Sequence, residues 1–326
     1  MGIPDRIRNK VAKLLDCSTD NIAHATSVTD TINLLANGFP FQDEDIVVTF
    51  KGDYPSNVLP WMLPAKKWGL KHVMLENPLP DADWLRENLP IKTKLLDISH
   101  VAFDTGRKVD LVSIGKLCAE RDIIFVVDAT QSFGGMPITK EELSYIDVLA
   151  CSCYKWLLGP YGSSFAYYSD RMIELIGSKS GNWITSPNSK HVWNLLDYTT
   201  ESLPGARKFD RGQTPNMLIN AALEGSLEVL SKIGLDYIQE NNQKLRNFFM
   251  DNLPYNKFSL VTPKDRSMVG NIVSIQAKSG DSLQLEAELK HYNIDVSVRE
   301  GKLRLSFHLF NTQKQLETLI KVLDKH

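Results

Sequence analysis

Short apolar runs alternate with amphipathic helical stretches along the first half of the chain, and this alternation constrains the fold more than any other feature. Each run has the length of a buried strand rather than that of a helix. Buried strands that alternate with helices are typical of a mostly parallel sheet flanked by helices. The sequence therefore predicts an α/β fold. The expected strands are residues 46–50, 72–75, 95–99, 123–127 and 148–150.

The second half of the chain has a different rhythm. Residues 177–212 form a polar stretch rich in Ser, Asn and Pro, and a loop of this length is usually functional or interfacial. We expect a large domain over residues 1–233 and a smaller C-terminal α+β domain over residues 234–326. The expected elements after the loop are helices at 215–233 and 235–253, a strand at 271–277, a helix at 283–292, a strand at 303–307 and a closing helix from 312.

Composition and charge exclude several classes of protein. The chain has 326 residues, 43% hydrophobic and 23% charged, with a formal net charge of -2. These values are typical of a soluble globular protein and not of a general polyanion binder. The longest apolar stretches are far shorter than the ~18 residues of a membrane span. Because residues 1–6 offer no apolar signal segment, we expect a cytoplasmic protein that binds neither nucleic acid nor membrane.

Cysteine and histidine form no metal-binding pattern. The four cysteines lack C-x-x-C spacing and the seven histidines are scattered, so we expect reduced thiols and no metal site. Cys151 and Cys153 alternate within a strand-like segment. Their side chains should therefore project to one face of the sheet and pack there.

Chemically reactive side chains follow two of the expected strands. Asp128 comes directly after one strand, and Lys155 lies beyond the end of the next. A third segment, Ser27-Val28-Thr29, precedes an expected helix. Ligands of open α/β sheets collect beyond the carboxyl ends of the strands, so these residues are candidates for one site.

A carboxylate and a lysine placed in this way suit pyridoxal phosphate, which needs a covalent amine and an anionic partner for its ring nitrogen. Hydroxyl groups and backbone N–H groups at a helix N-terminus would bind its phosphate. Taken singly, these residues have structural explanations, because Asp, Ser and Thr cap helices and Lys is usually a surface residue. Separate structural roles would have to occur by chance in the chain order that a pyridoxal phosphate site requires. We therefore favour one cofactor site over separate structural roles.

The segments around Asp128 and Lys155 resemble the class V aminotransferase family of fold type I pyridoxal-phosphate-dependent enzymes, which includes cysteine desulfurases, kynureninase and isopenicillin N epimerase. Residues 126–131, Val-Val-Asp-Ala-Thr-Gln, look like the family's ring-binding strand. Residues 154–160, Tyr-Lys-Trp-Leu-Leu-Gly-Pro, look like its lysine segment and are similar in sequence to that segment in the epimerase branch. The similarity runs from about Arg6 to the C-terminus. It implies a pyridoxal phosphate cofactor, Lys155 as the Schiff-base lysine, and Asp128 on the pyridine nitrogen.

The same resemblance assigns contacts to the phosphate of the cofactor. Ser27-Val28-Thr29 occupies the place of the family's Gly-Thr-Thr phosphate turn. Ser152 and Tyr154, in the lysine segment, would also touch the phosphate. The desulfurase branch carries His where Tyr154 stands.

The resemblance also assigns contacts to the ring. Tyr54 takes the place of the aromatic or His side chain that stacks on the ring. Thr130 would lie against the ring face, and Gln131 would lie near the phenolic oxygen. The sequence departs from the desulfurases at Phe103, where they have an Asn that hydrogen-bonds this oxygen. Because Phe cannot make that bond, Gln131 carries the contact alone or the electronics of the ring differ.

Substrate and subunit contacts follow from two further segments. Residues 298–312 are similar to the family's closing Arg-x-Ser and Tyr-Asn-Thr signature, which implies that Arg304 clamps the carboxylate of an amino-acid substrate. Arg299 is a second candidate, although a lone Arg on a strand is usually structural. Residues 209–216 are similar to the loop that reaches the phosphate of the neighbouring subunit, which implies a homodimer with shared sites.

The sequence leaves the reaction open. No Cys follows Cys153, so the mobile persulfide-forming Cys of desulfurases is absent and the usual desulfurase activity is disfavoured. A class V transferase that transaminates an α-amino acid is our first expectation, with a lyase or an epimerase of the same fold as the alternative. Family members usually carry several dozen residues before the first helix, so a truncated cofactor-binding protein with little catalysis is a further alternative. A plain nucleotide-binding domain is excluded, because neither G-x-G-x-x-G nor a P-loop occurs.

Overall fold

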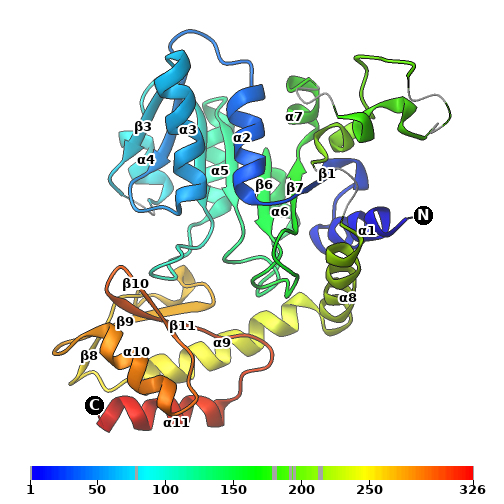
Figure 1. Ribbon diagram of the computed structural model, residues 1–326. Helices are drawn as coiled ribbons and strands as arrows, with labels where there is room; N and C mark the ends of the chain where they lie inside the picture. Colours follow the sequence, from blue (N-terminus) through cyan, green and yellow to red (C-terminus); the bar gives the residue numbers. More distant parts are fainter. Residues whose placement is uncertain are drawn as a thin grey trace.

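The chain folds around two separate β-sheets (Figure 1). The computed structural model describes residues 2–77, 80–177, 182–190, 193, 196–211 and 216–325.

The larger sheet has seven strands in the order β1-β7-β6-β5-β4-β2-β3. The five strands from β6 to β3 run parallel, while β7 lies antiparallel to both of its neighbours. This arrangement confirms the predicted mostly parallel α/β sheet. The strands are β1 (Ile22–Ala25), β2 (Ile46–Phe50), β3 (Lys71–Leu75), β4 (Thr93–Ser99), β5 (Ile124–Asp128), β6 (Val148–Ser152) and β7 (Ser164–Tyr168).

Helices cover both faces of this sheet because its central strands are apolar on both sides. In β5, Phe125 and Val127 join one buried cluster with residues of α5 and α8, while Ile124 and Val126 join a second cluster with residues of α2 and α3. Two-sided burial is what the continuous apolar runs of parallel strands require. The helices are α1 (Ile3–Leu15), α2 (Val28–Gly38), α3 (Pro55–Trp68), α4 (Ala82–Asn88), α5 (Leu111–Glu120), α6 (Lys140–Ser144), α7 (Asp170–Leu175) and α8 (Met217–Ile233).

Three elements of this unit have no clear signal in the sequence. α3 holds Pro60 and Pro64 in its interior, where proline normally interrupts a helix. Packing preserves the helix, because Trp61 of α3 is fully buried against the sheet. β1 and β7 are short and pair with each other at one edge, so their apolar pattern is weak.

The smaller sheet has four antiparallel strands in the order β10-β11-β9-β8. It packs against its helices in a separate apolar cluster that includes Phe249, Ile275 and Leu319. The boundary at residue 233 stays a prediction. The elements are α9 (Leu235–Asp251), β8 (Phe258–Leu260), β9 (Ile272–Ala277), α10 (Ser282–His291), β10 (Ser297–Arg299), β11 (Lys302–Ser306) and α11 (Gln313–Lys325).

The strand order of the larger sheet marks one place for a ligand. β2 lies between β3 on one side and β4 on the other, so the order of the strands reverses there. Ligands of open α/β sheets bind at such a switch point, beyond the carboxyl ends of the strands. Over the described part of the chain, no helix has the length and apolarity needed to cross a membrane.

Candidate active site

A pocket of about 220 Å³ lies beyond the carboxyl ends of β4, β5 and β6. Ser99, Asp128 and Ser152 are the last residues of these three neighbouring strands, so the sheet itself brings them together. All ten residues that the sequence predicts for cofactor binding line this pocket, and Ser56 and Ser99 join them. The ten are Ser27, Val28, Thr29, Tyr54, Asp128, Thr130, Gln131, Ser152, Tyr154 and Lys155.

Asp128 presents a buried carboxylate to the pocket. Its Oδ1 accepts a hydrogen bond from the Thr130 backbone N–H at 2.8 Å, and its Oδ2 lies 3.4 Å from the Asn57 amide nitrogen. Burial raises the pKa of Asp128, while the hydrogen bond from Thr130 and the charge of Lys155 oppose this rise. The Oδ2 atom therefore keeps room for a stronger hydrogen-bond donor from the pocket.

Lys155 lies in the turn that follows β6, and its amine is half-buried between two aromatic rings. Its Nζ is 5.2 Å from the centre of the Tyr54 ring and 5.6 Å from that of Tyr154. Burial lowers the pKa of Lys155; Asp128 opposes this, and the positive charge of Arg304 reinforces it. A lysine with a lowered pKa has a larger fraction of neutral amine than a surface lysine, and only the neutral amine acts as a nucleophile or a base.

The N-terminus of α2 forms another wall of the pocket. Ser27 caps this helix, since its side chain accepts a hydrogen bond from the Asp30 N–H at 3.1 Å. The first-turn N–H groups of a helix have no partner within the helix and favour anions. The Thr29 hydroxyl donates to the Ser56 hydroxyl at 2.8 Å. The wall therefore offers hydroxyl and amide donors, as a phosphate requires.

Residues after β5 and β6 hold one another in place. The Thr130 hydroxyl accepts the Ser152 backbone N–H at 3.0 Å, which joins the ends of the two strands. Gln131 is buried beside them, 7% exposed. The Tyr154 ring stacks on Tyr161 with centroids 4.2 Å apart, so its orientation is set by a neighbour in the segment between β6 and β7.

Tyr54 and Phe103 form an aromatic pair beside the lysine. The two rings meet edge to face with centroids 5.3 Å apart. Tyr54 is also the N-cap of α3 and lies at the switch point between β2 and β4. Phe103 thus supports the Tyr54 ring by packing, in a place where its side chain offers no hydrogen bond.

Arg304 and Arg299 occupy different environments. Arg304 is half-buried; its Nη1 donates to the Phe103 carbonyl at 2.9 Å and its Nε donates to the Ser297 hydroxyl at 3.2 Å. These contacts leave the Nη2 edge of the guanidinium for a carboxylate. Arg299 is exposed and donates to the Val298 carbonyl. The positive charges of both arginines reach Lys155.

The segment 103–106 joins the site to the smaller sheet. Its four successive carbonyls each accept a hydrogen bond from that side of the molecule. Lys302 of β11 forms an ion pair with Asp104 at 2.5 Å. The position of the Arg304 guanidinium is therefore coupled to that of Phe103. The four donors are Arg304 Nη1, the Ser274 hydroxyl, the Thr262 hydroxyl and the Gly270 N–H.

Four residues of this site carry no assignment from the sequence. Ser99 ends β4, Asp53 lies between β2 and α3, and Ser56 and Asn57 lie in the first turn of α3. Asp53 hydrogen-bonds Ser99, and Asn57 reaches Asp128. They could have been found by the same rule that identified Asp128, because they also follow the end of a parallel strand.

Three of the four cysteines, Cys118, Cys151 and Cys153, are buried, and Cys17 is half-buried. Cys151 and Cys153 pack in the same apolar cluster, as predicted, and burial raises the pKa of both thiols. Between Arg299 and Arg304, β10 and β11 are joined by a two-residue turn, Glu300-Gly301, with positive φ at both positions. Such a tight hairpin has no room for a mobile loop.

The predicted loop to a neighbouring subunit falls partly outside the described residues, because residues 212–215 are not among them. Within the described part, Arg211 pairs with Asp30 of α2 in the same chain at 3.0 Å. A homodimer therefore stays a prediction. Among the described residues, no group of three or more His, Cys, Asp or Glu side chains could hold a metal ion.

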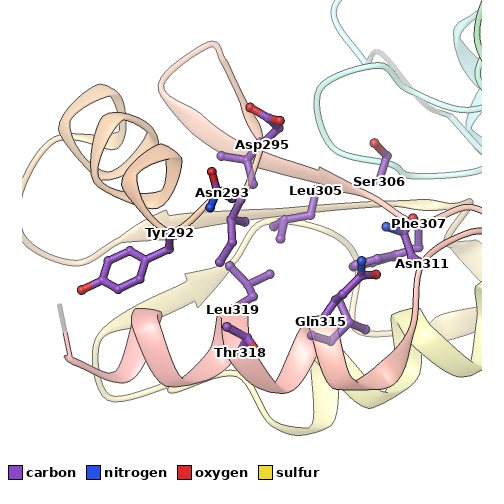
Figure 2. Close-up of a pocket in the computed structure, with 13 residues that line it drawn as sticks. Tyr292, Asn293, Asp295, Leu305, Ser306, Phe307, Asn311, Gln315, Thr318 and Leu319 are labelled. Atoms are coloured by element: carbon purple, nitrogen blue, oxygen red, sulfur yellow. The ribbon is translucent and has the colours of Figure 1, made fainter.

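A second pocket of about 260 Å³ lies on the smaller sheet, between β11, α11 and the segment before β10 (Figure 2). Asn293, Asp295, Ser306 and Gln315 form polar parts of its wall, and Leu305 and Leu319 are apolar parts. It contains none of the predicted site residues.

The chain is similar to known proteins in both sequence and structure. A sequence profile described as "Aminotransferase class-V" matches residues 2–319. A probable cysteine desulfurase of Pyrococcus abyssi is 27% identical over 98% of this chain and 82% of the relative. The apo structure of a cysteine desulfurase from Thermococcus onnurineus NA1 superposes with a TM-score of 0.87, at 23% identity, over 99% of this chain and 83% of the other. The cystine C-S lyase C-DES, solved with its product cysteine persulfide, gives 0.86 at 18% identity, over 99% and 86% of the two chains.

Proposed function

Because the chain belongs to the class V aminotransferase family, whose members depend on pyridoxal phosphate, we propose that it uses this cofactor in the pocket around Lys155 to act on α-amino acids. The family is the one that the motifs around Asp128 and Lys155 resemble. One observation carries the assignment of the site: Lys155, Asp128 and the N-terminus of α2 line a single pocket. Each supplies a group that the cofactor requires.

The residues present fit the cofactor. The Asp128 Oδ2 atom lies 3.4 Å from the Asn57 amide nitrogen, which is a long contact, and it can accept a hydrogen bond from a protonated ring nitrogen. The hydroxyls of Ser27, Thr29 and Ser152 and the first-turn N–H groups of α2 would hold the phosphate. Tyr54 would stack on the ring. When bound, pyridoxal phosphate supplies an electron sink that lowers the barrier to breaking a bond at the α-carbon of an amino acid.

Lys155 has two tasks in this proposal. Its Nζ would hold the cofactor covalently, and the same amine would take the proton from the α-carbon of the substrate. The lowered pKa of the lysine, caused first by burial and further by Arg304, increases the fraction of neutral amine near neutral pH. The aromatic rings of Tyr54 and Tyr154 limit the directions from which the amine can act.

Arg304 is the proposed binding residue for the substrate carboxylate. The Phe103 carbonyl and the Ser297 hydroxyl already hold two of its nitrogen atoms. The guanidinium is therefore oriented before substrate arrives, which reduces the entropy lost on binding. Arg299, which is exposed, contributes positive charge in this proposal rather than a direct contact.

A lyase reaction is the finer function that we favour, with elimination of a group from the β-carbon. The names of the relatives support it, since these include cysteine desulfurases and a cystine C-S lyase. The tight β10–β11 hairpin and the buried cysteines argue against a persulfide formed on the protein. Transamination, the first expectation from the sequence, would use the same Lys155 and Arg304. The products of the reaction distinguish it from elimination.

The proposed site would be shared between two copies of the chain. Support comes from the resemblance of residues 209–216 to the loop that reaches a neighbouring subunit. The oligomeric state in solution, measured by light scattering, tests this part separately.

An absorbance titration tests the proposed function. The purified protein with pyridoxal phosphate should absorb in the visible range, and amino acids from a panel that includes L-cysteine, L-cystine and L-alanine should shift the band. Lys155→Ala should lose the band, whereas Lys140→Ala, a change at an exposed lysine, should retain it. Pyruvate and ammonia as products indicate elimination, and a keto acid with retained amine on the cofactor indicates transamination. A band that no amino acid shifts would contradict the proposal.

A further inference from the structure

Asp53 connects three parts of the pocket wall. It follows β2, and its Oδ1 accepts the Ser99 hydroxyl at 2.5 Å and the Tyr54 N–H at 2.6 Å. Its Oδ2 accepts the Ser99 N–H at 3.0 Å. The carboxylate thereby fastens the start of α3 to the end of β4 and fixes the position of Tyr54.

Asn57 extends this network to Asp128. The Asn57 side chain is completely buried, and its amide nitrogen donates to the Ser99 hydroxyl at 2.9 Å. The same nitrogen lies 3.4 Å from Asp128 Oδ2 and 3.5 Å from Asp53 Oδ1. One amide group thus lies between two carboxylates, next to the pocket.

The carboxylates of Asp128, which is buried, and of Asp53, which is half-buried, repel each other. Burial raises the pKa of Asp53 to about 6; its hydrogen bonds oppose this and the negative charge of Asp128 adds to it. A third acid, Asp97, lies two residues before Ser99 in β4. Its Oδ2 accepts the Trp61 indole N–H at 2.7 Å. Burial raises the pKa of Asp97 well above its usual range.

We propose that Asp53 is a positioning residue of the cofactor site, which orients Asp128 through Ser99 and Asn57 and places a second negative charge near the Asp128 carboxylate. A protonated ring nitrogen on Asp128 would relieve the repulsion between the two carboxylates. The second acid therefore favours the protonated ring. This inference deepens the proposed function and rests on it.

The test compares two ligands that differ only at the ring nitrogen. Pyridoxal phosphate has the nitrogen, and 1-deazapyridoxal phosphate has a carbon in its place. Asp53→Asn removes the charge and keeps the shape of the side chain. It should weaken binding of pyridoxal phosphate about tenfold, from the loss of one nearby charge, and should change binding of the deaza analogue less than about twofold. Ser99→Ala removes only the hydroxyl that links Asp53 to Asn57. It should also weaken binding of pyridoxal phosphate more than binding of the deaza analogue, but by a smaller factor than Asp53→Asn.

Trp61→Phe is the matched control. It removes a hydrogen bond from α3 to the other buried acid, Asp97, and leaves Asp53 and its partners in place. Both ligands should bind this variant as they bind the wild type. Equal weakening of both ligands by Asp53→Asn would mean a purely structural role and would overturn the inference, as would no weakening of either. If the wild type binds neither ligand, the proposed function fails instead.

Discussion

Gly106 offers a direct test of the coupling between the site and the smaller sheet. This residue has φ +72°, and a Cβ atom added to it would lie 2.0 Å from the carbonyl oxygen of Ile272 in β9. Gly106→Ala therefore introduces a strained backbone and also a clash that neither backbone can avoid without moving. The segment 103–106 should move away from β9 by about an ångström, since real contacts of this type lie beyond 3.0 Å.

The expected loss of stability has two parts. A non-glycine residue in the left-handed region costs about 1–2 kcal/mol. The movement weakens the hydrogen bonds from the Gly270 N–H and the Thr262 hydroxyl to the segment, which are 2.8 and 2.6 Å long, at about 1 kcal/mol each. We therefore expect Gly106→Ala to lower the free energy of unfolding by about 3–4 kcal/mol.

Gly69→Ala separates the two parts. Gly69 has φ +77° and no atom within 4 Å of an added Cβ, so this variant should lose only the conformational part, about 1–2 kcal/mol. Urea unfolding of the cofactor-free protein measures both variants against the wild type. If the two variants lose the same stability, within about 0.5 kcal/mol, the contact with β9 contributes nothing and the coupling is refuted.

Two further predictions concern charge. Burial raises the pKa of Asp53 from 3.8 to about 6, so the folded state holds this proton more tightly than the unfolded state. The cofactor-free protein should lose stability as the pH rises through that interval, by about 1–2 kcal/mol after allowance for the partial exposure of Asp53. Asp53→Asn should flatten the pH profile of urea unfolding; an unchanged slope would contradict the shift. Arg304→Lys keeps the positive charge but loses the planar guanidinium with its paired N–H donors. KM for a reactive amino acid should therefore rise about 10- to 100-fold, with a smaller change in kcat. An unchanged KM would contradict the role of Arg304 in substrate binding.

Most of the residues that line the pocket, and the strands that position them, can be recognised from the sequence. Asp128 and Lys155 follow strongly apolar strands, and such strands are recognisable because two-sided burial requires continuous apolar runs. Once the strands are known, the parallel arrangement brings their carboxyl ends to one edge of the sheet. The chemistry of the pocket could therefore be predicted from residues that lie far apart in the chain.

Contacts between distant segments could not be predicted in the same way. The network of Asp53 and Asn57 depends on α3, a helix whose interior prolines hide it from sequence rules and whose stability comes from the burial of Trp61. The hydrogen bonds from the smaller sheet to residues 103–106 have no local signal, because their donors lie more than 150 residues further along the chain. Short edge strands such as β1 also depend on a partner for their existence.

The central claim is that the amine of Lys155 holds the cofactor against the carboxylate of Asp128. Reduction of the protein loaded with pyridoxal phosphate by borohydride, followed by mass spectrometry of its peptides, tests this claim most directly. We predict one phosphopyridoxyl group per chain, on Lys155, and a much lower yield from the Asp128→Asn variant loaded under the same conditions. A label on another lysine, or scattered over several with no preference for Lys155, would contradict the account.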